Sequence, residues 1–107
     1  MAAQPALISK AFQAFMQAAP KHAQVWSATV QGLASASALD GKTTALCYLA
    51  VLSALRLESG IPFHVQSAKK AGASREEIIS ALLVGLPAAG NAVTACLPAA
   101  LEAYDAA

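Results

Sequence analysis

Two polar residues that lie close together in the chain are suited to acid–base chemistry on a small molecule. The imidazole of His64 can accept or donate a proton near neutral pH. Glu58 precedes the helix expected to carry His64, where a carboxylate could orient the imidazole or exchange a proton itself. We therefore take His64 and Glu58 as candidate catalytic residues.

Both residues also have a purely structural interpretation, which the sequence leaves open. His64 shares a helical face with Ile61, Val65 and Ala68, so it points inward. A core histidine that donates a hydrogen bond to a backbone carbonyl would show the same pattern. Glu58 could be a solvated acid favoured at a helix start. The other histidine, His22, follows Lys21 at a helix start and is expected at the surface.

The two cysteines provide little chemistry. Cys47 and Cys96 lie 49 positions apart, without a CxxC pair or a His/Cys cluster, which argues against a disulfide scaffold and a metal site. In a hairpin turning near residues 58–60, Cys47 and His64 would be offset by ~9 Å along the helix axes. That offset is too long for a nucleophile–base pair within one subunit. We expect no metal and no cofactor.

The composition limits the partners. The 107 residues carry a net charge of +1, too little to attract nucleic acid or an anionic membrane. Only 12% of the residues are charged and 57% are hydrophobic, so a monomer would have few charges to cover its surface. The chain is therefore predicted to form a homo-oligomer.

Hydrophobic spacing predicts one all-α domain, residues 1–107, with about six helices. Proline, glycine and capping residues delimit them as 5–19, 20–35, 41–57, 62–72, 74–86 and 92–104. The third helix is apolar on nearly every side, as expected at the centre of a fold or an assembly. Residues 78–101 carry no charge, but proline and glycine interrupt them, so we expect no membrane span. With no signal peptide apparent, we expect a cytoplasmic location.

The stretch that begins at His64 is the most specific motif of the chain. It reads His64-Val-Gln-Ser-Ala-Lys-Lys-Ala-Gly72-Ala-Ser-Arg-Glu-Glu-Ile-Ile79 and follows Leu39-Asp-Gly-Lys-Thr and an apolar helix. This pattern resembles the carboxymuconolactone decarboxylase / alkylhydroperoxidase D (AhpD)-like family over about residues 39–104. The resemblance implies an all-α, AhpD-like bundle in homo-oligomers, commonly trimers or hexamers.

The redox branch of that family uses a Cys-x-x-Cys-x-x-x-His motif and a glutamate in the preceding helix. His64 matches the histidine, but Leu57 and Gly60 occupy the two cysteine positions and Ala45 the glutamate position. Disulfide exchange needs both sulfurs. Thiol peroxidase activity is therefore the least favoured of the family's activities.

The decarboxylase branch keeps the histidine without the cysteines. Its reaction removes a carboxylate from a lactone acid with a double-bond shift, which needs an acid/base and a cationic anchor. By their positions in the chain, His64 and Glu58 could serve the first role, and Arg56 near the end of the central helix is the best single candidate for the second. A small lactone or keto acid is the implied substrate. A non-catalytic ligand-binding or structural oligomer remains the alternative.

Overall fold

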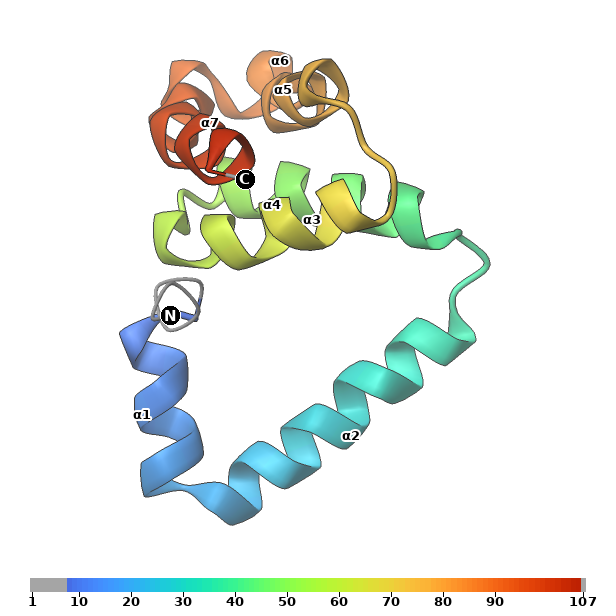
Figure 1. Ribbon diagram of the computed structural model, residues 1–107, viewed down its shortest axis with the longest axis vertical. Coiled ribbons are helices and arrows are strands. Elements are labelled where there is room, and N and C mark those ends of the chain that lie inside the picture. Colours follow the sequence, from blue (N-terminus) through green and yellow to red (C-terminus); the bar gives the residue numbers. More distant parts are fainter. Residues whose placement is uncertain (1–7, 107) are drawn as a thin grey trace. The chain divides into compact units, whose positions relative to one another are not determined.

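The described part of the chain, residues 8–106 of a computed structural model, is helical and contains no strand (Figure 1). It has six α-helices of nine or more residues, a four-residue α6 and short 3-10 helices. The all-α prediction is confirmed. The chain divides into two compact units, Met1–Asp40 and Gly41–Ala107. The proposal of a single domain stays a prediction.

The first unit contains α1 (Lys10–Ala18) and α2 (Pro20–Ala36). The Ser9 hydroxyl caps α1 by accepting a hydrogen bond from the Phe12 amide at 3.1 Å. The expected start at residue 5 lies outside the described residues, and helix begins only after the Ser9 cap. Pro20 opens α2 as predicted. Neither helix has a buried residue, so the described part of this unit, residues 8–40, has no core of its own.

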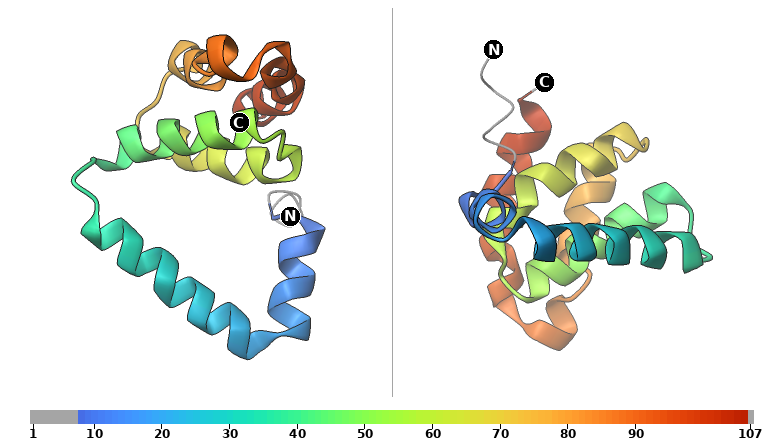
Figure 2. Two further views of the ribbon diagram at one scale, coloured as in Figure 1. Left: turned by 180° about the vertical axis from the view of Figure 1, so that it is seen from behind. Right: turned by 90° about the horizontal axis from the view of Figure 1, so that it is seen from below.

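The second unit packs its helices in two layers. Figures 1 and 2 show α3 and α4 side by side, with α5 and α7 across one face of that pair. Its elements in chain order are α3 (Gly41–Ala54), η2 (Glu58–Gly60), α4 (Ile61–Lys70), α5 (Arg75–Leu83), α6 (Leu86–Ala89), η3 (Asn91–Cys96) and α7 (Leu97–Asp105).

The core of the second unit lies between these layers. Helices α3, α4, α5 and α7 and the 3-10 helix η3 all contribute buried side chains, including Leu49, Leu52, Ile61, Val65, Ile78, Leu82, Val93, Cys96 and Ala100. The Ser53 hydroxyl, also fully buried, donates a hydrogen bond to the Val93 carbonyl at 2.8 Å. This bond ties α3 to η3.

The predicted helix 41–57 ends earlier, at Ala54, because the chain turns there through a Schellman motif. The Leu57 amide donates to the Leu52 carbonyl at 2.9 Å, and the Arg56 amide donates to the Ser53 carbonyl at 3.1 Å. Arg56 takes the left-handed position with φ of 58°, where glycine is usual. Because position 56 carries arginine rather than glycine, the sequence did not indicate that the helix ends here.

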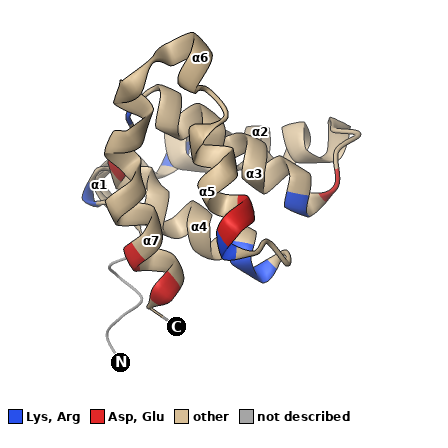
Figure 3. Cartoon of the chain, turned by 90° about the horizontal axis from the view of Figure 1, so that it is seen from above, with Lys and Arg blue, Asp and Glu red and all other residues tan. Residues whose placement is uncertain are grey.

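The end of α4 uses the same motif with the expected residue. Gly72 has φ of 101° and donates to the Lys69 carbonyl at 3.0 Å, which confirms its prediction as a helix stop. The predicted capping box follows, since the Ser74 and Glu77 side chains each accept a hydrogen bond from the other's amide. Charged positions gather at this corner (Figure 3).

Ion pairs hold this corner to its neighbours. Lys42 Nζ lies 2.9 Å from Glu77 Oε2, and the Arg75 guanidinium donates to both carboxylate oxygens of Asp105 at 3.0 and 3.1 Å.

The predicted last helix, 92–104, begins instead as the 3-10 helix η3 and becomes α-helical at Leu97. Pro98 lacks an amide hydrogen, so it suits the first turn of a new helix better than the interior of a continuous one. The interruption of residues 78–101 is therefore confirmed. Among the described residues, no helix is long and apolar enough to cross a membrane.

Candidate functional site

His64 lies in the first turns of α4 and leans against two aromatic rings. The centroid of the Tyr48 ring, on α3, is 4.4 Å from that of the imidazole, at an interplanar angle of 46°. The Phe63 ring meets the imidazole edge-on, with centroids 5.1 Å apart. The imidazole is half-buried, whereas Ile61, Val65 and Ala68 on the adjoining face are fully buried.

The imidazole of His64 has no hydrogen-bond or ion-pair partner among residues 8–106. Within the described chain, His64 is therefore not a core histidine that is hydrogen-bonded to a carbonyl or a hydroxyl. Burial is the cause that lowers the pKa of His64 below its ordinary value of 6.5. The side chain is accordingly a neutral base at neutral pH.

The other two predicted site residues, Arg56 and Glu58, form no hydrogen bond or ion pair with the imidazole in the described chain. Arg56 and Glu58 are both exposed, in the connection between α3 and α4. Arg56 is held in the left-handed turn, and Glu58 begins η2. The sequence thus predicted that Arg56 and Glu58 lie just before the helix that carries His64. Within the described chain, neither side chain bonds to His64.

Of the positions that match the redox motif, Gly60 lies beside His64. A Cβ added to Gly60 would lie 4.0 Å from Cδ2 of His64 and 3.6 Å from the Leu52 methyl groups. Leu57, at the other cysteine position, is exposed, and Ala45 packs against the core. No sulfur stands at either cysteine position.

The two cysteines of the chain lie elsewhere. Cys96 is buried, and burial, followed by the charge of Glu58, raises the pKa of its thiol. Cys47 is exposed and lines the groove between α3 and α5, while the next residue, Tyr48, faces His64. Successive helical side chains point about 100° apart. Cys47 therefore does not share the face that carries the His64 site.

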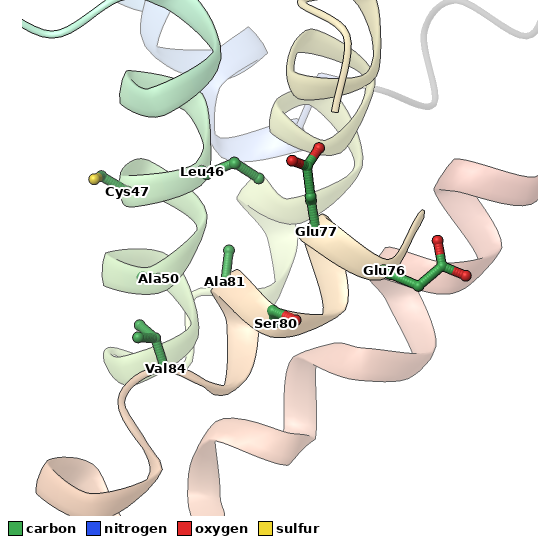
Figure 4. A pocket seen from close by; sticks show the side chains of 8 residues that line it. All are labelled: Leu46, Cys47, Ala50, Glu76, Glu77, Ser80, Ala81 and Val84. Carbon is green, nitrogen blue, oxygen red and sulfur yellow. The ribbon is translucent and has the colours of Figure 1, made fainter. Parts of the chain in front are cut away.

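Sequence reasoning missed the groove between α3 and α5. Its volume is about 460 Å³, and its lining is mostly apolar with two carboxylates at one end (Figure 4). The lining side chains are Leu46, Cys47, Ala50, Glu76, Glu77, Ser80, Ala81 and Val84. The small residues Ala50 and Ala81 were a visible signal, but only the pairing of the two helices makes them neighbours.

The surface beside His64 is apolar and open. Tyr48 and Val51 on α3, and Leu55 directly after it, are 47%, 53% and 62% exposed. Phe63, whose ring contacts His64, is 45% exposed. We call these four residues the aromatic face. One chain buries only the opposite face of α3, through Leu49, Leu52 and Ser53. The expectation that a homo-oligomer buries the central helix heavily stays a prediction.

A comparison with protein families decides the affiliation of the chain. The sequence model described as "Carboxymuconolactone decarboxylase family" matches residues 20–102. The chain belongs to the carboxymuconolactone decarboxylase family. The match confirms the resemblance seen in residues 39–104 and extends it back over α2. No curated protein and no solved structure matches the chain significantly.

Among the described residues, no group of three or more His, Cys, Asp or Glu side chains is arranged to hold a metal ion. His64 is the titratable group that combines half-burial, aromatic contacts and a matched position in the motif.

Proposed function

We propose that this carboxymuconolactone decarboxylase-family protein is a lyase that carries out acid–base chemistry on a small lactone or keto acid, with His64 as the proton carrier. The observation that supports this function is the half-buried imidazole, which has no partner in the described chain and whose pKa burial lowers. The ring nitrogens of a purely structural histidine would form hydrogen bonds within the fold.

In the proposed reaction, the bond from the ring carbon to the substrate carboxylate breaks and CO₂ leaves. The electron pair of that bond enters the conjugated lactone, and a proton from the imidazolium of His64 goes to the carbon that receives the negative charge. His64 regains its proton from water. Burial favours the neutral imidazole, so the protonated form gives up its proton readily.

Glu58 and Arg56 complete the proposal. Arg56 would bind a substrate carboxylate through its guanidinium, and Glu58 would pass protons between water and His64. Both lie in the short connection that leads into α4, the helix that carries His64. They would serve the His64 of the same subunit or of a neighbouring one. The left-handed conformation of Arg56 supports a functional role, because strained positions concentrate at functional sites.

We propose further that the protein works as a homo-oligomer, a trimer or a hexamer, in the cytoplasm. The exposed aromatic face supports the oligomer, because contiguous apolar surface on a small protein marks an interaction site. A second copy over this face would exclude water from one side of His64. Two free cysteines agree with a reducing compartment.

A non-catalytic ligand-binding or structural oligomer is the second candidate function. It is favoured by the uncharged surroundings of His64, whose ring contacts in the described chain are aromatic. AhpD-like peroxidase activity is the weakest candidate, because Leu57 and Gly60 supply no thiol.

The test of the proposed function is turnover by matched histidine variants. Wild type, His64→Asn and His22→Asn are each incubated with carboxymuconolactone and a panel of small lactone and keto acids, and CO₂ release is followed. We expect turnover by wild type and His22→Asn and its loss in His64→Asn, with the oligomer intact by light scattering. Absence of turnover in all three, with no acid raising the melting temperature, would favour the structural oligomer.

A further inference from the structure

The hydroxyl of Tyr48 is the polar end of the ring that lies against His64. The centroids of the two rings are 4.4 Å apart, and the tyrosine is half exposed, so a small molecule can reach it. Of the two tyrosine hydroxyls, that of Tyr104 donates to the Ala73 carbonyl at 3.5 Å. The hydroxyl of Tyr48 forms no hydrogen bond within the described chain. It is therefore a free donor beside the proposed proton carrier.

The phenol and the imidazole are held at a fixed separation. Tyr48 belongs to α3 and His64 to α4, two helices that pack side by side in the same unit. Their neighbours in the chain, Leu49 and Val65, are fully buried, so the core fixes the backbone at both positions. A ligand small enough to lie on the imidazole can therefore also accept a hydrogen bond from the phenol.

The proposed decarboxylation places negative charge on an oxygen of the substrate. Where the lactone carbonyl is conjugated with the carbon that loses CO₂, the electron pair of the broken bond delocalises onto the carbonyl oxygen. The imidazolium of His64 then protonates the carbon next to the carbonyl, which restores the C=O bond and leaves the ring double bond shifted. A hydrogen-bond donor at that oxygen stabilises the charge as it develops, and tyrosine hydroxyls are among the groups that serve this purpose.

We propose that Tyr48 is a catalytic residue whose hydroxyl donates a hydrogen bond to the substrate's carbonyl oxygen while that oxygen carries the negative charge. The phenol keeps its proton throughout, because the proton that enters the product comes from His64. Arg56 retains the separate role of binding a substrate carboxylate. This inference rests on the proposed function and narrows its substrate class to acids that form an enolate oxygen when CO₂ leaves.

Tyr48→Phe tests this role, because it removes the hydroxyl and keeps the ring against His64. We expect kcat for carboxymuconolactone to fall by about tenfold or more, since removing one oxyanion donor from a dry site costs about 100-fold and Tyr48 is half exposed. KM should change little, because the carbonyl of the bound substrate does not yet carry the charge. The matched control is Tyr104→Phe, at the other tyrosine of the chain, which should leave kcat unchanged.

Binding of an unreactive enolate distinguishes a hydrogen bond to the substrate from a structural role of the ring. Tetronate is the enolate of a small lactone, shares its negative charge between the enol and carbonyl oxygens, and has no carboxylate to lose. We expect Tyr48→Phe to weaken tetronate binding by about tenfold in NMR titrations, as the loss of a hydrogen bond to a charged oxygen requires. Tyr104→Phe should bind it as wild type does. The pKa of His64 should stay below 6.5 in Tyr48→Phe, because the ring still buries the imidazole.

The outcomes separate this inference from the proposed function. Turnover and tetronate affinity that stay unchanged in Tyr48→Phe, or that fall equally in Tyr104→Phe, would overturn the role of Tyr48 and leave the acid–base role of His64 standing. Tetronate binding that depends on the Tyr48 hydroxyl, in a protein that releases no CO₂ from any acid, would support the contact and overturn the lyase. A wild-type protein that neither releases CO₂ nor binds tetronate would overturn both.

Discussion

The Tyr48 ring covers one side of the His64 imidazole, with their centroids 4.4 Å apart. This contact joins α3 to α4 and removes water from a group that has no hydrogen-bond partner in the described chain. The chemistry available to His64 therefore depends on a residue sixteen positions earlier, on another helix.

Removing the Tyr48 ring should raise the pKa of His64. Burial is what lowers this pKa, so Tyr48→Ala returns water to the imidazole and moves the value up toward 6.5. NMR titration of the imidazole signals measures the shift. Leu55→Ala is the control, since Leu55 belongs to the same exposed face but has no ring against His64. A pKa of His64 that moves equally in both variants would assign the effect to the face as a whole.

The two Schellman turns predict opposite effects of matched substitutions. Arg56→Gly should stabilise the fold by roughly 1 kcal/mol, because glycine takes the left-handed conformation without the cost that arginine bears. Gly72→Ala should destabilise it by about the same amount. Urea unfolding measures both. If Arg56 also binds substrate, Arg56→Gly should lose activity while gaining stability. An Arg56→Gly variant that is no more stable than wild type would contradict the strained turn.

The hydroxyl of Ser53 should contribute measurably to stability. Ser53→Ala leaves the Val93 carbonyl without its buried donor, which costs about 1–3 kcal/mol. Ser67→Ala, at an exposed position of α4, should change the free energy of unfolding little. Thermal melts of the two variants provide the comparison, and equal melting temperatures would show that the bond between α3 and η3 adds nothing.

Acid should weaken the corner where α4, α5 and α7 meet. The hydrogen bond from Lys42 lowers the pKa of Glu77 below 4.5, and the one from Arg75 lowers the pKa of Asp105 below 3.8. Carboxylates with depressed pKa values stabilise the fold above their ordinary values, and that contribution disappears as pH falls through the folded values. The melting temperature of Glu77→Gln/Asp105→Asn should therefore fall less than that of wild type below pH 4.5. Because both groups are exposed, high salt should reduce the difference.

Local signals made most of the fold predictable. The Ser74–Glu77 capping box, the stop at Gly72 and the start at Pro20 depend on residues within one turn, and all three occur where the sequence indicates. The end of α3 was not predictable in the same way, because an arginine occupies the position that normally carries glycine.

The sequence identified His64 as the candidate residue, but it did not indicate which side chains surround the imidazole. The motif and helical spacing identified His64, whereas its contact with Tyr48 depends on how α3 packs against α4. The groove depends likewise on α3 meeting α5, which no local pattern encodes. Arg56 and Glu58 were correctly placed next to the His64 helix, and their contacts with a substrate stay a prediction.

The most direct measurement of the central claim is the titration of His64 in the wild-type protein, free and with carboxymuconolactone or another small lactone or keto acid added. We predict a pKa below 6.5 in the free protein, because the imidazole is half-buried without a partner, and a rise when a ligand carboxylate binds beside it. A pKa at or above 6.5 in the free protein that no such acid changes would contradict His64 as the proton carrier.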